Sequence, residues 1–587
     1  MPRQLDGTTP GGANEKTRTD SWATGTLSRR QAVVGAGAAV AGSGAGLSWL
    51  RNPTPVQAAR RQSTPAAEFR PSLHSYPLVQ EKKTLRVLIP HWGINWAENA
   101  FTQWYEDRTN VHIEWTVVED EIALTQLNLQ LASGDYPDIV MGFNWAPFEL
   151  TPTTISAYGG QGLFVPLNDY LATSAPNYNT YVLPEYPIAE KLVTMPDGEI
   201  YSLPHVNDCY HCQFTTQKLW IQTAWLEQLG LTAATTLDEF EAVLRAFKDM
   251  DPNGNGSPDE IPLTSQTGWP LDGFFMSPFT PNPGKPWLYR DAGKVTAAYM
   301  QDGWIQGSNY LRRLLEGQLL SPDAFTQNEE QITGLGNNNR IGAAPGVVQG
   351  NFVRLTDGAA GLWSTFLLQA PLAGPDGTRR SFRRFNEANL GNVFVVTDKC
   401  EDPALAVAWA DGLYEWETGL RATFGVPDVD WRWADGTELG IDGEPAKYSR
   451  IPGDPNAPED ASDNDAAWNQ LGLLFRSNKD RLSEAVLNDP NTSAEVLLYR
   501  GCKEQLEPFG TTEDMDVLRP IFTPDEAIRV SELETVIAGY VEEQLALQVT
   551  GQVDAEAGRG DFLDQLSSLG IEEYLSIQQT AHDRMGA

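Results

Sequence analysis

The segment DPNGNGSPDE at residues 251–260 carries an oxygen-bearing side chain at nearly every second position. Calcium takes about six to eight oxygen ligands from carboxylates, amides and carbonyls, and ligands at alternate positions of a tight loop can surround one ion. Gly254 and Gly256 permit the positive φ angles that such a loop needs. The sequence therefore predicts a calcium loop. Its expected ligands are Asp251, Asn253, Asn255, Ser257, Asp259 and Glu260.

This loop departs from the EF-hand pattern, in which a glutamate stands at position twelve. That position is Pro262 here, and Glu260, two residues earlier, is expected to supply the remaining oxygens. The competing interpretation is a polar turn, because Asn, Gly and Pro favour turns without any metal. We favour the metal, since the ligand types are regularly spaced and a further acid follows. An ion held entirely by protein oxygens has no open position for catalysis, so its expected role is structural.

The segment HVNDCYHC at 205–212 offers a second set of side chains that can bind metal. Zinc and copper ligand types are present at His205, Cys209, His211 and Cys212. Their spacing matches no zinc motif. Cys209–Cys212 and Cys400–Cys502 could instead form two disulfides in an oxidising compartment, and free thiols are the third alternative. The sequence leaves these alternatives open, although so few cysteines exclude a disulfide-dense scaffold.

The chain that precedes these segments alternates predicted strands and helices. Apolar or β-branched runs predict strands at 83–92, 111–118 and 136–145, and amphipathic runs predict helices at 99–110 and 121–135. Such alternation indicates right-handed crossovers and a parallel sheet. Further on, we expect a helix with a capping box from Thr236 to Glu239, a strand and helix at 390–416, and a mostly helical segment at about 523–587.

Ligands of parallel sheets bind beyond the carboxyl ends of the strands. Several tryptophans stand at or near such positions, and aromatic faces suit the apolar side of a sugar while Asp and Asn bind its hydroxyls. The candidate ligand-binding residues are Trp92, Trp96, Asn144, Trp145, Trp269, Asp272 and Trp363. For each tryptophan the competing interpretation is core packing.

Length and charge limit the class of protein. A chain of 587 residues with 41% hydrophobic and 20% charged residues is globular and is expected to form two to four domains. The formal net charge of −36 makes nucleic acid and anionic membrane surfaces unfavourable partners. Neither a Gly-x-Ser-x-Gly nor a His-Glu-x-x-His motif occurs in the sequence. A carboxylate pair for glycoside hydrolysis stays open, because acidic residues are abundant.

Residues 1–58 have the form of a twin-arginine export signal. Arg29 and Arg30 precede a weakly apolar stretch rich in Gly and Ala, and VQA at 56–58 predicts cleavage after Ala58. An uncleaved membrane anchor is the alternative. No cysteine follows the apolar stretch, so we expect no lipid attachment, and 59–82 is expected to be a linker.

Five segments, taken in order, resemble the extracellular solute-binding proteins of ABC importers. The segments are GLFVPLNDYL (162–171), MPDGEIYSLP (195–204), the stretch from LWIQTAWLEQLG to IPLT (219–264), the stretch from DAGKVT to DAFTQ (291–327), and SLGIEEYLSIQQTAHDR (568–584). Within that family, the chain is most similar to the long group that binds oligosaccharides and includes lipoproteins and the alginate-oligosaccharide binders. The resemblance covers about 83–584.

The resemblance implies an α/β, two-lobed periplasmic-binding-protein-like (type II) fold with a hinge and a ligand cleft between the lobes. The implied N-terminal lobe is 83–212 plus about 390–425, and the C-terminal lobe is about 213–389 plus 426–587. The chain would cross between lobes near 213–220, 390 and 425. The same resemblance implies a bound calcium in the loop at 251–260, which the alginate binders also carry. The turn FGVPD at 424–428 departs from the family, which often has a Glu there.

The expected function is therefore that of an exported, monomeric protein that captures an oligosaccharide or a similar polyhydroxylated solute and delivers it to an ABC permease. Two alternatives stay open. One is a secreted enzyme acting on glycans. The other is a peptide or glycerophosphodiester binder on the same fold, for which a cleft lined by Arg or Lys would be expected.

Overall fold

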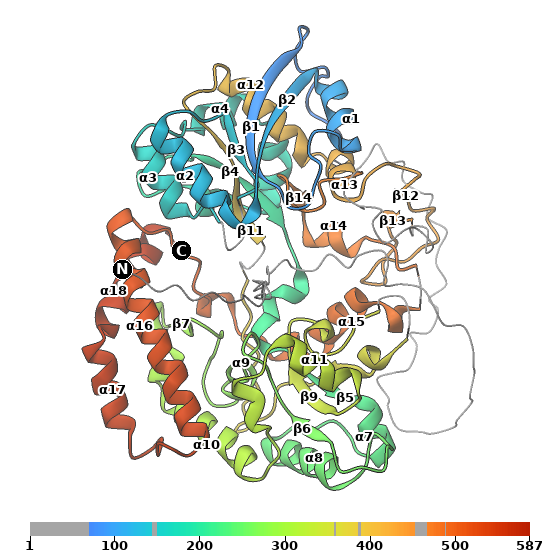
Figure 1. Cartoon of the computed structure of the whole chain (residues 1–587), viewed down its shortest axis with the longest axis vertical. Helices are drawn as coiled ribbons and strands as arrows, with labels where there is room; N and C mark the ends of the chain where they lie inside the picture. Colours follow the sequence, from blue (N-terminus) through green and yellow to red (C-terminus); the bar gives the residue numbers. More distant parts are fainter. Residues whose placement is uncertain are drawn as a thin grey trace, which may run out of the picture.

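The computed structural model describes residues 70–143, 149–356, 360–385, 389–451, 466–487 and 489–586. These residues form two α/β lobes (Figure 1). The first lobe is built on a six-stranded sheet of order β14-β4-β11-β3-β1-β2, and the second on a four-stranded sheet of order β10-β5-β9-β6. Among the described residues, no helix is both long and apolar enough to cross a membrane.

The N-terminal part of the first sheet has the predicted alternation. Strands β1 (Lys83–Pro90), β2 (Val111–Val118) and β3 (Ile139–Met141) are separated by helices α1 (Ala100–Thr109) and α2 (Ala123–Ser133). β1 pairs in parallel with both β2 and β3, which confirms the predicted parallel arrangement. Only β3 is much shorter than expected.

The register of the first sheet fixes the direction of each strand. β4 (Ser202–Asn207) ends directly before the chain leaves for the second lobe, and its Asn207 pairs with Asn389 at the start of antiparallel β11 (Asn389–Val396). β11 pairs antiparallel with β3 as well, so β3 and the parallel β1 also end at the edge that lies toward the second lobe.

The second sheet is oriented the opposite way. β5 (Leu219–Gln222) begins where the chain arrives from the first lobe, and Leu219 pairs with Pro345 at the end of antiparallel β9 (Ile341–Pro345). β6 (Ile261–Leu263) is parallel to β9. The carboxyl ends of β6 and β9 therefore lie at the edge of the second sheet that is nearer to the first lobe.

Two chain crossings between the lobes lie close to the expected positions. The first, 208–218, contains the short 3-10 helix η5 (Tyr210–Gln217), which Figure 1 shows between the lobes. The second runs from β10 (Phe366–Leu368) to β11. The two crossings are hydrogen-bonded to each other, because the backbone N–H of Arg384 donates to the carbonyl of Gln213 at 2.9 Å.

The third crossing differs from the expectation of about 425. β14 (Phe475–Arg476) pairs in parallel with β4, and Trp468 and Leu473 are buried in the core of the first lobe. The chain reaches the second lobe only at α15 (Ala494–Gly501), whose Leu498 packs in a core with Trp220. The expectation that all of 426–587 belongs to the second lobe was therefore wrong for the part of this range that precedes α15.

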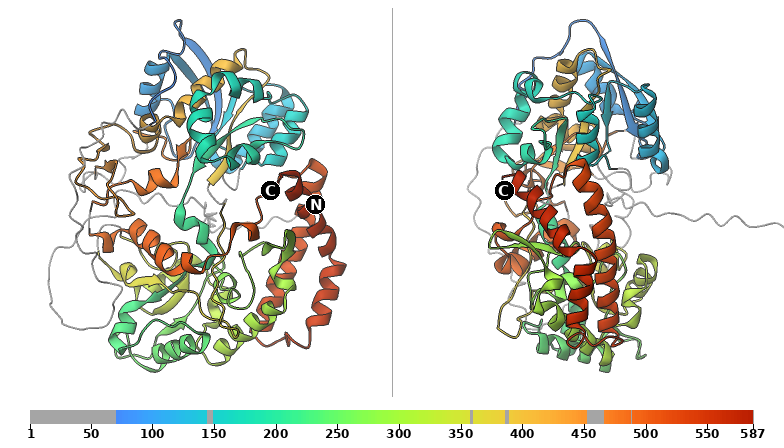
Figure 2. Two further views of the ribbon diagram at one scale, coloured as in Figure 1. Left: turned by 180° about the vertical axis from the view of Figure 1, so that it is seen from behind. Right: turned by 90° about the vertical axis from the view of Figure 1, so that its left-hand side faces the viewer.

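The C-terminal segment is helical, as expected. Helices α16 (Pro524–Val549), α17 (Arg559–Ser568) and α18 (Ile571–Arg584) run along one side of the molecule, beside the second lobe and up to the first (Figures 1 and 2). The segment also contacts the first lobe. Ile521 packs in a first-lobe core, and Arg519 forms an ion pair of 2.7 Å with Glu149.

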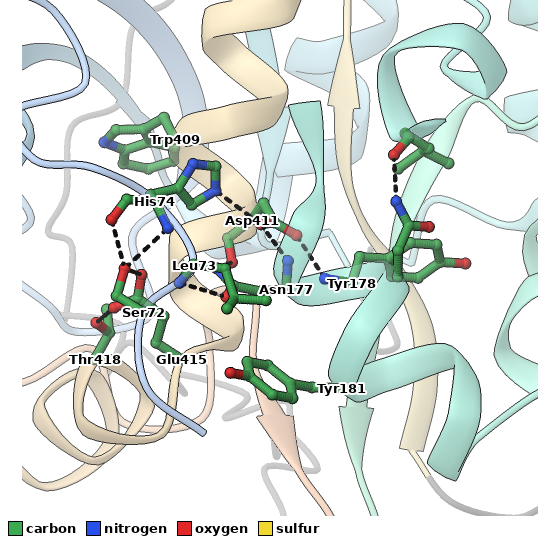
Figure 3. Close-up of polar contacts among 12 residues, drawn as sticks. Ser72, Leu73, His74, Asn177, Tyr178, Tyr181, Trp409, Asp411, Glu415 and Thr418 are labelled. Carbon is green, nitrogen blue, oxygen red and sulfur yellow. Dashed lines mark hydrogen bonds and ion pairs between the residues drawn. The ribbon is translucent and has the colours of Figure 1, made fainter. Parts of the chain in front are cut away.

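The start of the described chain is docked on the first lobe rather than free. His74 Nε2 lies 2.8 Å from Oδ2 of Asp411, the last residue of α12 (Pro403–Asp411), as Figure 3 shows. Ser72 Oγ and Tyr76 Oη each donate to Glu415 Oε1 at 2.6 Å. The expected linker at 59–82 therefore becomes an ordered arm from Arg70, because buried carboxylates hold it. Residues 1–69, which contain the expected export signal, lie outside the described residues.

Candidate functional site

The loop at 251–260 follows α8 (Leu237–Asp249), which begins with the predicted capping box. Gly254 and Gly256 have φ of 70° and 78°, as the loop prediction required. The backbone N–H groups of Asn255 and Gly256 donate to the two carboxylate oxygens of Asp251, at 3.1 and 2.8 Å. The chain thus wraps around the Asp251 carboxylate.

The amide side chains of the loop point toward a second carboxylate. Asn253 Nδ2 and Asn255 Nδ2 both donate to Asp259 Oδ1, at 3.2 and 2.9 Å. The Ser257 N–H donates to Asn255 Oδ1 at 2.7 Å. Arg340, just before β9, lies 3.1 Å from Asp259 Oδ2 and ties the loop to the second sheet. The oxygen-bearing side chains of the loop therefore converge.

Glu260 provides the test of whether these residues fit a cation. Both of its carboxylate oxygens are buried and have no hydrogen-bond partner among the described residues. Desolvation is the main cause that raises the pKa of Glu260 above its usual value; the backbone N–H groups of Glu260 and Asn253 oppose this rise, and the charges of Asp251 and Asp259 add to it. A buried carboxylate that accepts no well-formed hydrogen bond is costly unless a cation neutralises it. The all-oxygen donor set is of the kind that calcium prefers, so the residues fit this ion.

Trp92 lies just beyond the carboxyl end of β1, at the edge of the first sheet that lies toward the second lobe. Its φ of 52° is in the left-handed region, which is uncommon for a residue with a side chain. Two hydrogen bonds hold it there: its N–H donates to Asp120 Oδ1 at 2.9 Å, and its Nε1 donates to the carbonyl of Gly142 at 3.1 Å. Strained backbone held in this way is concentrated at functional sites.

Trp269 lies beyond the carboxyl end of β6, at the edge of the second sheet that is nearer to the first lobe. It is half-buried, and its Nε1 has no hydrogen-bond partner among the described residues. A tight turn positions it, because the Trp269 N–H donates to the carbonyl of Gln266 at 3.0 Å. The buried Gln266 side chain in turn donates to the carbonyl of Asn351, which follows β9, at 3.2 Å.

Two other tryptophan candidates lie in cores, where they cannot touch a ligand. Trp96 is 1% exposed and packs against Trp115 and Trp468, with ring centroids 5.4 and 5.5 Å away. Trp363 is fully buried in a second-lobe core. These two tryptophans follow the core-packing interpretation.

Asp272 is also a structural residue. It is 3% exposed, and its Oδ2 accepts a hydrogen bond of 2.6 Å from Trp287 Nε1. Desolvation raises its pKa. The expectation that Asp272 binds a hydroxyl of the ligand was therefore wrong. Asn144 and Trp145 lie outside the described residues.

The cysteine alternatives are resolved in part. Cys209 and Cys212 form a disulfide, whereas Cys400 and Cys502 are free and buried. Cys400 lies in a first-lobe core and Cys502 in a second-lobe core, so these two cysteines follow the free-thiol alternative and not the disulfide alternative. His205 is buried, with Nδ1 3.0 Å from the carbonyl of Gly472, and desolvation lowers its pKa to about 4.

Two residues that hold the candidate tryptophans in place were not predicted from the sequence. Asp120 lies just after the carboxyl end of β2. Ligands of parallel sheets bind beyond such strand ends, so this position could have been predicted if polar residues after every strand had been considered. Gln266 carried no comparable signal, because its role depends on Asn351, far away in the sequence.

Comparison with known proteins places this chain in a family. Residues 93–415 match the model of the bacterial extracellular solute-binding proteins, and the chain belongs to that family. It is 25% identical over 524 residues to the fructooligosaccharide ABC transporter substrate-binding protein FusA of Streptococcus pneumoniae serotype 4, covering 87% of this chain and 92% of FusA. It is also 25% identical over 276 residues to the polygalacturonan/rhamnogalacturonan-binding protein YtcQ of Bacillus subtilis, covering 47% and 52% of the two chains.

Solved structures share the fold. A FusA EF-hand mutant of S. pneumoniae in complex with fructo-nystose superimposes with a TM-score of 0.66 at 23% identity. A solute-binding protein of Bifidobacterium longum infantis, described as binding HMO, gives 0.67 at 22%. The alginate-binding protein AlgQ2 without calcium ion gives 0.60 at 20%. Each comparison covers 86% of this chain and 99% of the other, and together they show the two-lobed solute-binding fold.

Proposed function

We propose that this protein captures an oligosaccharide between its two lobes and delivers it to an ABC permease. The observation that carries the proposal is the opposed orientation of the two sheets. The carboxyl ends of β1 and β3 lie toward the second lobe, those of β6 and β9 lie toward the first, and each edge presents a tryptophan, Trp92 and Trp269.

The chemistry of the two tryptophans suits a sugar. An indole face packs on the apolar C–H face of a pyranose or furanose, and an indole N–H can donate to a hydroxyl. The Trp269 Nε1 is itself buried, so the half-exposed ring, rather than the N–H, is the part of this side chain that would pack on a sugar. Closure of the lobes by a hinge motion would bring both rings onto one ligand. The names of FusA and YtcQ, which specify carbohydrates, support this class of ligand.

Calcium is proposed as a structural ion in the loop at 251–260. Support comes from the two carboxylate oxygens of Glu260 that lack partners and from the converging amides of the loop. The names of two fold relatives, an EF-hand mutant and a form without calcium ion, are consistent with it. The ion would hold the turn between α8 and β6, and it has no proposed part in binding the sugar.

Binding without turnover is part of the proposal, as are export through a twin-arginine signal and action as a monomer. Relatives with similar sequences are named as binding proteins, and the family is extracellular. The export signal and the oligomeric state rest on the sequence expectations alone.

A thermal-shift screen of the protein from residue 59 onward, against a panel of oligosaccharides, tests the proposal. A ligand at 100 times its dissociation constant stabilises the folded state by about 2.7 kcal/mol. We expect stabilisation by one class of glycan, with the glycan recovered intact by chromatography. Stabilisation that fades while the glycan is consumed would show an enzyme instead. No shift with any glycan would favour the peptide or phosphodiester alternatives.

A further inference from the structure

The first crossing between the lobes contains a compact group of sulfur, nitrogen and oxygen atoms that the proposed function does not use. Cys209 and Cys212 frame His211 in a Cys-x-x-Cys segment at the start of η5. The two sulfurs and one ring nitrogen of His211 all lie within 4.8 Å of one another. Cys209 and His211 are buried, and Cys212 is partly buried.

The imidazole of His211 is held in a defined orientation. Lys218 Nζ lies 3.2 Å from Nδ1, and the same ammonium donates to the carbonyl of Val347. The other nitrogen, Nε2, lies 3.4 Å from Cys209 Sγ and 3.5 Å from a carboxylate oxygen of Glu495. Nε2 thus faces a sulfur and a carboxylate at the same time, while Cys212 Sγ lies 3.9 Å from the other ring nitrogen, Nδ1.

These atoms become metal ligands only when the disulfide is reduced. A dithiol reductant transfers two electrons and two protons to the Cys209–Cys212 bond, yields two thiols and is itself oxidised to a disulfide. Binding of a divalent ion then releases the two thiol protons and leaves two thiolates on the metal. Nearby cations favour thiolates, and Lys218 and Arg481 both lie close to this group.

We propose that the reduced form of this segment is a binding site for a thiophilic metal ion such as Zn²⁺, with Cys209, Cys212 and His211 as ligands and Glu495 completing the coordination. Two sulfurs, one nitrogen and one oxygen form a donor set that zinc accepts in tetrahedral geometry. The first crossing between the lobes then carries either a disulfide or a metal ion, and the two states exclude each other.

The position of the site gives either state a mechanical role. Asp208 and Arg481 belong to the first lobe, and the Arg481 side chain donates to the carbonyl of Asp208 at 2.9 Å. Lys218 and Glu495 belong to the second lobe, at the start of β5 and on α15. The Cys-x-x-Cys segment joins these two groups, so either cross-link would brace the first crossing at the point where the lobes articulate.

Cobalt(II) is the probe for the test, because cobalt–thiolate bonds give intense charge-transfer absorption that oxygen ligands do not. The full chain is reduced with a phosphine, which becomes a phosphine oxide, and excess calcium occupies the loop at 251–260. We expect one equivalent of thiolate-bound cobalt in the reduced protein, displaced by zinc, and none in the oxidised protein. Absence of the absorption in reduced protein with a native circular dichroism spectrum would overturn the proposal.

Two further measurements keep the test independent of any one variant. A Cys209→Ser/Cys212→Ser protein should lose the absorption, and its persistence would assign the band to Cys400 or Cys502 and refute the site. In reduced wild-type protein, zinc at 100 times its dissociation constant should slow alkylation of Cys209 and Cys212 about 100-fold. Alkylation mapped by mass spectrometry and unchanged by zinc would likewise refute the site.

Discussion

The indole Nε1 of Trp92 donates to the carbonyl of Gly142 at 3.1 Å, so the second residue after β1 is hydrogen-bonded to the residue that follows β3. This bond spans the carboxyl ends of two neighbouring parallel strands, where ligands of such sheets bind. Trp92 is thus fixed before any ligand arrives, and preorganised side chains lose less conformational entropy on binding.

The first prediction concerns the residue that holds the backbone of Trp92. Asp120→Ala removes the acceptor of the Trp92 N–H and frees a left-handed backbone to relax. We expect the affinity for the oligosaccharide to fall roughly threefold to tenfold, or about 0.7–1.4 kcal/mol, which is part of the roughly 1.5–3 kcal/mol that a hydrogen bond to a charged group contributes. Isothermal titration calorimetry measures the change. The matched control is Asp135→Ala, an exposed acid after α2, and equal affinities for the two variants would contradict a positioning role for Asp120.

The second prediction concerns Glu260 and calcium. Burial raises the pKa of this carboxyl above 4.5, so its ionised form destabilises the folded chain when no cation is bound. Without calcium, stability should therefore decline as pH rises from 4.5 through the raised pKa, and calcium should remove this decline. Below 4.5 the group is protonated in both the folded and the unfolded chain and has no effect.

Glu260→Gln removes the negative charge of this side chain and keeps its size, so it tests the effect of the charge alone. In EDTA at neutral pH, the variant should melt at a higher temperature than the wild type, because a buried charge has been removed. With calcium the order should reverse, since the variant has lost a charged ligand and should bind the ion at least about tenfold more weakly. Glu504→Gln, an exposed acid on the second lobe, is the control and should follow the wild type. A variant that still gains the full calcium stabilisation would remove Glu260 from the site.

The third prediction concerns the N-terminal arm. Asp411 is fully buried and accepts bonds from His74 and from the backbone N–H groups of Asn177 and Tyr178 (Figure 3). Asp411→Ala leaves these donors without their acceptor, and a buried donor left unsatisfied costs about 1–3 kcal/mol. Urea denaturation should show this loss, whereas Asp107→Ala, an exposed acid on α1, should change stability little. A loss of less than about 1 kcal/mol would mean that the arm is not anchored through Asp411.

Local chemistry could be predicted from the sequence, whereas long-range packing could not. The loop at 251–260 contains all of its own ligand types and its two glycines, so a short window was enough to predict its wrapping. The capping box of α8 was predictable for the same reason. The parallel strands β1 and β2 also followed from local pattern, because each is a continuous apolar or alternating run.

The tryptophans show where that reasoning fails. Trp92 and Trp96 both follow β1 and differ by four positions, yet one lies at the sheet edge and the other in the core. The difference depends on Trp468, which packs against Trp96 from a distant part of the chain. In the same way, β14 pairs with β4 through only two residues, which is too short to leave a periodic signal, so the third crossing was misplaced.

The most direct test of the central claim is calorimetric titration of the wild type, Trp92→Ala and Trp269→Ala with the oligosaccharide that the screen identifies. If the sugar lies between the lobes, each substitution should weaken binding by about tenfold or more, since each ring supplies about 1.4 kcal/mol or more from its own side. Both variants should keep the melting temperature of the wild type within a few degrees. Wild-type affinity in either variant would show that the ligand is not held between these two residues, and would contradict the account.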